Sequence, residues 1–355
     1  MAALLLVANP RIFSSSRLAL ERQSSAISLA IVLDHALMGS DGKVPWGSGQ
    51  LGLFETRAPS DPFAGVRRLA ETIPAGVRFG TSSWTFPGWA GLVYHKRYAN
   101  RPAFVRESLR EYASHPLFGT VGIDRSFYNP IPVEDFALYA SQLPDGFLCA
   151  MKVWSELTTR VFTHGPRAGT VNRAFLDPEL FLTQVWSPIE AAFVDHLGPL
   201  IVEVPPAKGS VNAAGFAARV DRFLRAMPPA LFAFELRDPR LLSGDYVSVL
   251  RSHGAAHVYN LWRGMPDLVA QRAKTGPLWA PLVLRLMMPI NTKYTQLKEA
   301  FAPFDRLRAP QPEMRAQVVE LIHEAVRVAQ PAFVLVNNKA EGCSPLTVQA
   351  LVRML

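Results

Sequence analysis

Short apolar runs alternate with longer amphipathic segments from Val77 to the end of the chain. The runs are rich in Val, Leu, Ile and Phe, the residue types that favour strands. They predict strands over Val77–Gly80, Thr120–Ile123, Phe147–Val153, Leu200–Val204, Leu231–Leu236, His257–Asn260, Leu282–Leu286 and Phe333–Val336. Helical periodicity lies between them, over Pro102–Ala113, Val133–Gln142, Phe181–His196, Ala213–Ala226, Tyr246–Ser252, Pro312–Ala329 and Pro345–Leu355. The segment after His257–Asn260 is rich in Gly and Pro and gives the weakest helical pattern.

Strands that alternate with helices in this way form parallel sheets covered on both faces. Closure into a (β/α)8 TIM-type barrel, an α/β fold, is the natural arrangement for eight such units. The alternative is an open doubly wound sheet, but no G-x-G-x-x-G motif follows the first strand. We therefore predict a TIM-type barrel domain over residues 76–355.

Residues 1–75 differ from the rest of the chain. Serines lie among arginines up to residue 25, and a Gly- and Pro-containing linker follows from residue 47 to 62. The segment resembles an amphipathic presequence, but it lacks an A-x-A-like cleavage site after a clean apolar stretch. We expect an N-terminal extension that is poorly ordered or partly helical, or a start codon assigned too early with Met38 as the true start.

Composition narrows the class of protein. Hydrophobic residues make up 49% of the chain and charged residues 19%, so a large core can form. No run of 18 uncharged apolar residues occurs, which argues against a membrane-spanning helix. Two cysteines exclude a disulfide scaffold and a four-thiolate zinc site. We expect a cytoplasmic protein without membrane contact, and its net charge of +8 favours an anionic partner.

Charged residues occupy the ends of the predicted strands, where barrel enzymes place their chemistry. Lys152, Glu203, Glu235 and Arg285 lie within otherwise apolar runs, and Arg237 follows Glu235 by two residues, so both point to the same side. Buried charges are rare unless they are paired. These residues therefore form either a structural ion-pair network or a site for a ligand, and the sequence leaves both interpretations open.

Aromatic and amide side chains follow other strands of the same barrel. The residues in question are Trp84, Tyr128, Trp154, Trp262, Asn260, Asn337 and Asn338. A long loop, Ser155–Leu176, adds Arg160, His164, Arg167 and Arg173. We interpret this loop either as a mobile cationic flap or as a solvated surface loop. Cations beside aromatic rings suit a nucleobase above phosphate contacts, and equally a small pocket with a few polar anchors.

Metal and nucleophile motifs are not found in the sequence. The eight histidines show neither H-x-H nor H-E-x-x-H spacing, and there is no G-x-S-x-G elbow and no P-loop. Cys149 alternates with apolar neighbours, as a buried core residue does. We expect no metal and no cofactor.

Six motifs in order resemble a known family. They are G-T-S-S-W-T-F-P-G-W-A-G (residues 80–91), R-S-F-Y-N-P (125–130), F-L-C-A-M-K-V (147–153), I-V-E-V-P-P (201–206), F-E-L-R (234–237) and V-L-V-N-N-K-A-E-G (334–342). Together they resemble the YecE-like family, domain of unknown function 72 (DUF72), from about Val77 to Leu355. The resemblance implies a TIM-type barrel with a conserved mouth. Some members have been likened to endonuclease IV-type barrels, which implies a nucleic-acid alternative by analogy.

The family pattern carries over onto individual positions of this sequence. These are Gly80, Trp84, Trp89, Phe127, Tyr128, Lys152, Pro205, Pro206, Glu235, Arg237, Arg285, Asn337 and Asn338. The chain departs from the pattern elsewhere. Gly122 and Asp124 stand where the family usually has Glu and Asn, Glu203 replaces a usual Gln, and Met287–Met288 replace a usual His-Gly.

These observations lead to a functional hypothesis. We predict a metal-independent enzyme, a hydrolase or a proton-transfer enzyme, that acts on a small anionic substrate at the C-terminal rim of the barrel. We assign proton transfer to Lys152 or Glu235. Substrate binding is assigned to Trp84, Tyr128, Arg237, Asn260, Arg285, Asn337 and Asn338. The alternative is a protein that binds or processes nucleic acid with a basic flap and a stacking ring.

Overall fold

The computed structural model describes residues 61–163, 165–207, 209–289, 292 and 294–355. Residues Ser60–Leu355 form one compact unit. The predictions for the N-terminal extension fall mostly on residues 1–60, outside the described residues. Within 61–75 lies a helix, α2 (Ala64–Ala70), and the ring of Phe63 just before it packs edge-on against the rings of His95 and His115.

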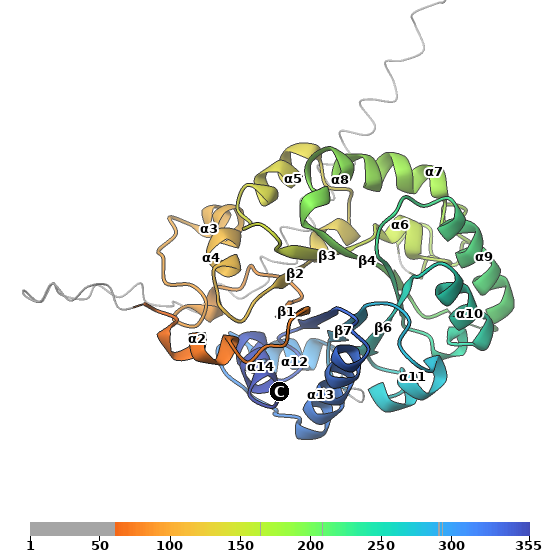
Figure 1. Ribbon diagram of the computed structural model, residues 1–355. Coiled ribbons are helices and arrows are strands. Elements are labelled where there is room, and N and C mark those ends of the chain that lie inside the picture. The colour runs from red at the N-terminus through yellow and green to blue at the C-terminus, as the bar shows by residue number, and fades with distance from the viewer. Residues whose placement is uncertain (1–60, 164, 208, 290–291, 293) are drawn as a thin grey trace, which may run out of the picture. The chain divides into compact units, whose positions relative to one another are not determined.

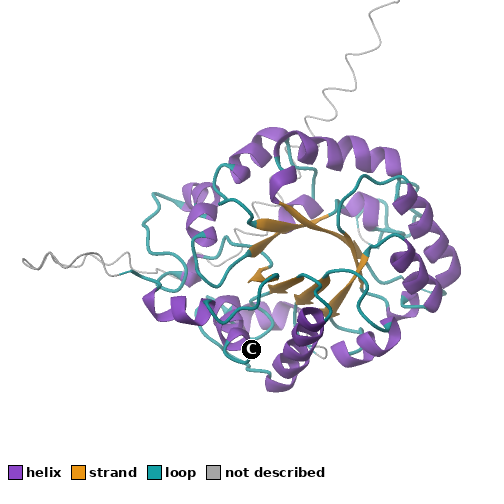
Figure 2. Ribbon diagram, in the orientation of Figure 1, coloured by secondary structure: helices purple, strands orange, loops and turns teal. Residues whose placement is uncertain are grey.

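The eight strands close into a parallel barrel in which every strand pairs with its sequence neighbours and β8 pairs with β1. The strands are β1 (Val77–Thr81), β2 (Thr120–Ile123), β3 (Leu148–Lys152), β4 (Leu197–Val204), β5 (Phe232–Leu236), β6 (Ala256–Leu261), β7 (Leu282–Leu286) and β8 (Ala332–Val336). The predicted (β/α)8 TIM-type barrel is therefore confirmed. Figures 1 and 2 show the strands at the centre and the helices in a ring around them.

Helices follow the strands around the outside of the barrel. They are α3 (Arg101–Glu107), α4 (Leu109–Ala113), α5 (Val133–Ala140), α6 (Ser155–Thr158), α7 (Pro178–Phe181), α8 (Ser187–Ala192), α9 (Ala213–Arg225), α10 (Gly244–Ser252), α11 (Leu268–Thr275), α12 (Tyr294–Phe301), α13 (Pro312–Arg327) and α14 (Ser344–Val352). Short 3-10 turns lie at η1 (Pro87–Trp89), η2 (Asp124–Phe127), η4 (Val194–His196) and η5 (Pro239–Leu241), and a π-helical turn at η3 (Leu182–Trp186). No helix in the described part of the chain is both long enough and apolar enough to cross a bilayer.

Two glycines let β1 and β2 approach each other. A Cβ atom on Gly80 would lie 1.9 Å from the backbone oxygen of Thr120, and one on Gly122 would lie 2.5 Å from that of Ser82. Any larger residue would therefore force the two strands apart. The glycine at position 122, where the family usually has Glu, thus has a packing role in this chain.

Small apolar side chains fill the middle of the barrel. They form one buried cluster, with Ala150, Ile201, Ala233, Ala256, Val258, Val283 and Leu335 contributed by the strands from β3 to β8. A larger core of aromatic and aliphatic residues packs between the barrel and the helices. The barrel interior is therefore solid, and polar groups can meet only above this apolar layer.

Candidate functional site

The next inward-pointing residue above the apolar layer is polar on six strands. Successive side chains of a strand alternate between its two faces, so residues two apart share a face. Lys152, Glu203, Glu235, Asn260, Arg285 and Asn337 each lie two positions after an apolar residue of the central cluster. The barrel geometry thus places them together at the carboxyl ends of the strands.

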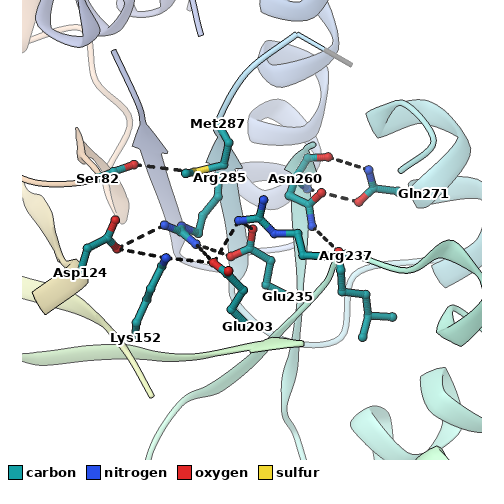
Figure 3. Close-up of polar contacts among 11 residues, drawn as sticks. Ser82, Asp124, Lys152, Glu203, Glu235, Arg237, Asn260, Gln271, Arg285 and Met287 are labelled. Atoms are coloured by element: carbon teal, nitrogen blue, oxygen red, sulfur yellow. Dashed lines mark hydrogen bonds and ion pairs between the residues drawn. The ribbon is translucent and has the colours of Figure 1, made fainter. Parts of the chain in front are cut away.

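Three cations and three carboxylates form one ion-pair network at this end, defined here as the mouth network of Asp124, Lys152, Glu203, Glu235, Arg237 and Arg285 (Figure 3). One oxygen of Glu203, Oε2, lies 2.9 Å from Lys152 Nζ, 3.0 Å from Arg237 Nη2 and 3.3 Å from Arg285 Nη1. Burial alone would raise the pKa of Glu203, but the positive charges of Arg237, Lys152 and Arg285 outweigh it and hold that pKa well below its usual range. Glu203 is therefore ionised.

The lower part of the network is enclosed. Glu235 is fully buried between two guanidinium groups, since it pairs with Arg285 and lies 2.6 Å from Arg237 Nη2. Burial would lower the pKa of Arg285, but the charges of Glu235, Asp124 and Glu203 raise it further above its usual value. The guanidinium carbon of Arg237 stacks 3.8 Å from the ring centre of Trp262. This part of the network is enclosed, and Arg237 Nε and Nη1 have no hydrogen-bond partner there among the described residues.

The upper part is more open and more loosely paired. Asp124 retains 30% side-chain exposure, and its Oδ1 lies 3.3 Å from Arg285 Nη2 and 3.8 Å from Lys152 Nζ. Lys152 also lies over the Phe127 ring, 4.6 Å from its centre. Asp124 is therefore the most exposed carboxylate of the mouth network.

Lys339, in the loop after β8, adds a fourth cation to the mouth. It is buried, its Nζ lies 6.0 Å from the centre of the Phe304 ring, and it is close enough to Asp124 for that carboxylate to act on its pKa. Burial, together with the positive charge of Lys298, lowers the pKa of Lys339 to about 8, and Asp124 offsets only part of this. Lys339 is not among the predicted site residues, although its place shortly after a predicted strand was a usable signal.

Three other predicted site residues, Asn337, Asn260 and Tyr128, are not members of the mouth network. Asn337 accepts a hydrogen bond from Lys339 N at 3.0 Å, so it shapes the loop that carries this lysine. Asn260 is completely buried, and its amide donates to the Leu236 carbonyl at 2.9 Å while its Oδ1 has no hydrogen-bond partner among the described residues. Tyr128 is 59% exposed.

Trp84 and Asn338 also lie outside the mouth network and contact other parts of the barrel. Trp84 is buried and packs edge-on against Tyr139. The Asn338 side chain accepts hydrogen bonds from Trp89 Nε1, Ser344 N and Ser344 Oγ, so it holds the first residue of α14. The structure thus unites four of the predicted residues with Asp124 and Glu203, two of the family departures.

The long loop after β3 is tied down rather than extended into solvent. Arg167 forms two hydrogen bonds with Glu156, at 2.6 and 2.7 Å, and Asn172 Nδ2 donates to the Thr159 carbonyl at 2.8 Å. The Arg160 side chain is turned inward, with 18% exposure, while Arg173 is exposed. His164 lies outside the described residues. The loop therefore offers fewer unpaired surface cations than its sequence indicates.

Metal-ligating groups do not cluster in the described part of the chain. No group of three or more His, Cys, Asp and Glu side chains there could hold a metal ion. Both cysteines are buried, and burial raises the pKa of the Cys343 thiol to about 11. Neither thiol is therefore prepared as a nucleophile.

Comparison with known proteins gives a family and a fold. The sequence model of the family described as "Protein of unknown function DUF72" matches residues 78–355. None of the curated proteins compared with the chain matches it. A crystal structure of a DUF72 family protein from Enterococcus faecalis V583 is similar, with a TM-score of 0.54 and 16% identity over 78% of this chain and 95% of that one. A DUF72 family protein from Thermotoga maritima MSB8 gives a TM-score of 0.52 and 19% identity over 78% and 98%.

Proposed function

The chain belongs to the family described as protein of unknown function DUF72, and from this premise we propose that it is an enzyme that binds a small anionic substrate in the mouth of the barrel and moves a proton there. The observation that carries the proposal is the mouth network, in which three carboxylates compensate three cations and the most exposed carboxylate, Asp124, contacts Arg285 and Lys152 only at 3.3 and 3.8 Å. A substrate anion can therefore compete with Asp124 for these two cations.

The proposed binding role falls to the loosely paired cations. Lys152 and Arg285 meet Asp124 at 3.8 and 3.3 Å, so a carboxylate or phosphate group of the substrate can approach the same two cations. Arg237 supports this, because its Nε and Nη1 are buried without a hydrogen-bond partner among the described residues. Buried donors without partners are costly, and a bound anion would relieve that cost.

The proposed proton-transfer role falls to Lys339, with Lys152 as the neighbouring cation. A general acid or base works best when its pKa lies near the operating pH, and a pKa of about 8 places Lys339 in that range. Glu235, which was predicted for the same role, is enclosed between Arg237 and Arg285. Our proposal therefore makes Glu235 a positioning residue that orients the two guanidinium groups.

The nucleic-acid alternative receives less support from the described residues. It relied on a cationic flap and on Trp84 or Tyr128 as a stacking ring. Arg167 is paired with Glu156, Arg160 is turned inward, and Trp84 is 4% exposed. Tyr128 is exposed, but the nearby Arg125 pairs with Asp135. The contacts of these residues therefore favour a small anion over nucleic acid as the ligand.

Native mass spectrometry of the purified protein tests the proposal. We expect a small anion to accompany the folded wild-type chain and to be released on unfolding. Lys152→Met and Lys339→Met should lose it, whereas Lys96→Met, which removes an exposed lysine, should keep it. A species that all four proteins retain equally would show that the ligand is not held by the mouth and would overturn the proposal.

A further inference from the structure

A cavity lies beside the end of β4, and none of the mouth network residues line it. It has a volume of about 450 Å³, within the range of small-molecule sites. One wall is the hairpin in the loop after β3, with Arg160, Val161, Phe162, Thr163, Ala168 and Gly169, and the other is Pro205–Ala207. Most of these side chains are apolar, so the cavity is an apolar slot with one guanidinium group in its lining.

The hairpin wall has a defined conformation. Phe162 and the 169–170 segment exchange backbone hydrogen bonds, from Phe162 N to Thr170 O at 3.1 Å and from Gly169 N to Phe162 O at 2.8 Å. Val161 and Val171 form an antiparallel bridge, and Arg167 stacks 3.8 Å from the centre of the Phe162 ring. These contacts fix the position of the Phe162 ring in the wall.

The opposite wall is held by a second set of contacts. Ala207 N donates to Asp238 Oδ2 at 3.1 Å, and Arg240 Nη2 donates to the Ala207 carbonyl at 2.7 Å. Asp238 also accepts from Arg240 Nε at 2.8 Å. The carboxylate of Asp238 is therefore occupied with holding this wall.

Arg160 is the unexplained group in this cavity. Its Nε and Nη2 atoms are buried and have no hydrogen-bond partner among the described residues, and the nearest carboxylate oxygen, Asp238 Oδ2, is 4.0 Å from Nη2. Burial lowers the pKa of Arg160, and Asp238 only partly compensates. A buried guanidinium with two unused donors is unfavourable unless a ligand pairs with it.

Nε and Nη2 of Arg160 lie along one edge of the guanidinium group, and this edge can bind both oxygens of a carboxylate. Elsewhere in this chain the same Nε and Nη2 pair binds a carboxylate with both oxygens, as Arg225 does with Asp221 at 3.0 and 3.2 Å. We propose that the cavity binds a small carboxylate with an apolar body, its two oxygens on Nε and Nη2 of Arg160 and its body against Phe162 and Pro205–Ala207. This inference is independent of the function proposed for the mouth.

A titration with 4-fluorobenzoate followed by fluorine NMR tests the proposal. The wild-type chain should bind it, and the neutral 4-fluorobenzyl alcohol should bind about tenfold more weakly because it lacks the charged group. Arg160→Met should weaken the benzoate by about tenfold or more, and Arg160→Lys should restore little because an ammonium group cannot present two parallel donors. Arg173→Met is the matched control and should bind as the wild type does, because Arg173 is exposed on the same loop.

Two further variants locate the bound benzoate. Phe162→Ala should weaken binding of the benzoate, whereas Lys96→Met, which removes an exposed lysine outside this cavity and outside the mouth network, should leave it unchanged. Folding is checked by thermal unfolding, and we expect Arg160→Met to be as stable as the wild type, because it removes a buried charge that lacks a full partner. Equal binding by Arg160→Met, equal binding by Phe162→Ala, or no binding by the folded wild type would each overturn the proposal.

Discussion

Lys152 Nζ lies 2.9 Å from Glu203 Oε2, the oxygen that Arg237 and Arg285 also approach. The ammonium group is the partly exposed member of the three cations around this oxygen, while the two guanidinium groups are almost fully enclosed. Lys152 can therefore turn from Glu203 toward a ligand without leaving that carboxylate unpaired. Arg237 and Arg285 thus contact Glu203 from the buried side of the mouth network, and Lys152 contacts it from the more exposed side.

The first prediction concerns Lys152→Met. We expect a loss of stability of about 1–3 kcal/mol, because the buried Glu203 loses one partner but keeps Arg237 and Arg285. Binding of acetate or inorganic phosphate should weaken by about tenfold or more. Urea unfolding and calorimetric titration measure the two effects. A collapse in stability with unchanged anion binding would make Lys152 a structural residue.

The second prediction concerns Glu235→Gln. Loss of this buried charge leaves Arg237 and Arg285 short of a partner, so the free energy of unfolding should fall by about 3–5 kcal/mol. Glu134→Gln, at an exposed position in the first turn of α5, should change it by less than about 0.5 kcal/mol. Denaturant unfolding of both variants provides the comparison. If Glu235→Gln changed the free energy of unfolding as little as Glu134→Gln does, the result would contradict the enclosed network.

The third prediction concerns pH and Lys339. Because its folded pKa is about 8 and its ordinary value is 10.5, the unfolded chain holds more protons between these values, and Lys339 makes stability rise with pH there. Below pH 8 the buried ammonium destabilises the folded state. Anion binding should instead weaken as pH rises through about 8, because Lys339 loses its charge.

Lys339→Met provides the check on both parts of this prediction. It should be more stable than the wild type at pH 7, by up to about 3 kcal/mol, and its anion binding should lose the pH dependence near 8. Lys298 and Asp124 act on the same group, so Lys298→Met should move the midpoint upward. An unchanged midpoint in Lys339→Met would assign the titration to another residue.

The fourth prediction concerns Asn338→Ala. The change leaves three buried donors, on Trp89 and Ser344, without their acceptor, so stability should fall by about 2–3 kcal/mol. Anion binding by the protein that remains folded should stay close to that of the wild type. Asn337→Ala is expected to behave oppositely, with a smaller stability change and weaker binding, because Asn337 supports the Lys339 backbone.

Much of the fold follows from the hydrophobic pattern. The predicted strands Thr120–Ile123 and Leu282–Leu286 coincide with β2 and β7, because a strand buried on both faces gives a continuous apolar run with clear ends. Helix ends were less accurate. The predicted helix Phe181–His196 is interrupted by a π-helical turn, η3, and by the 3-10 turn η4, which a periodicity of 3.6 residues does not reveal.

Other elements were missed for identifiable reasons. α11 begins after a Gly- and Pro-rich segment, and its start depends on the Asp267 side chain, which accepts from Ala270 N at 2.7 Å. Within the site, alternation along a strand predicted that Glu235 and Arg237 would share a side. It could not predict that Asn338 turns away to α14, or that burial shifts the pKa of Lys339, because both depend on tertiary contacts.

The central claim is that the mouth holds a small anion, and crystals soaked in bromide test it most directly through anomalous scattering. We predict a bromide peak in contact with the Nζ atom of Lys152 or Lys339, and its loss in crystals of Lys152→Met. Bromide at exposed lysines and arginines with none in the mouth would contradict the claim and would leave the network as a structural ion-pair cluster.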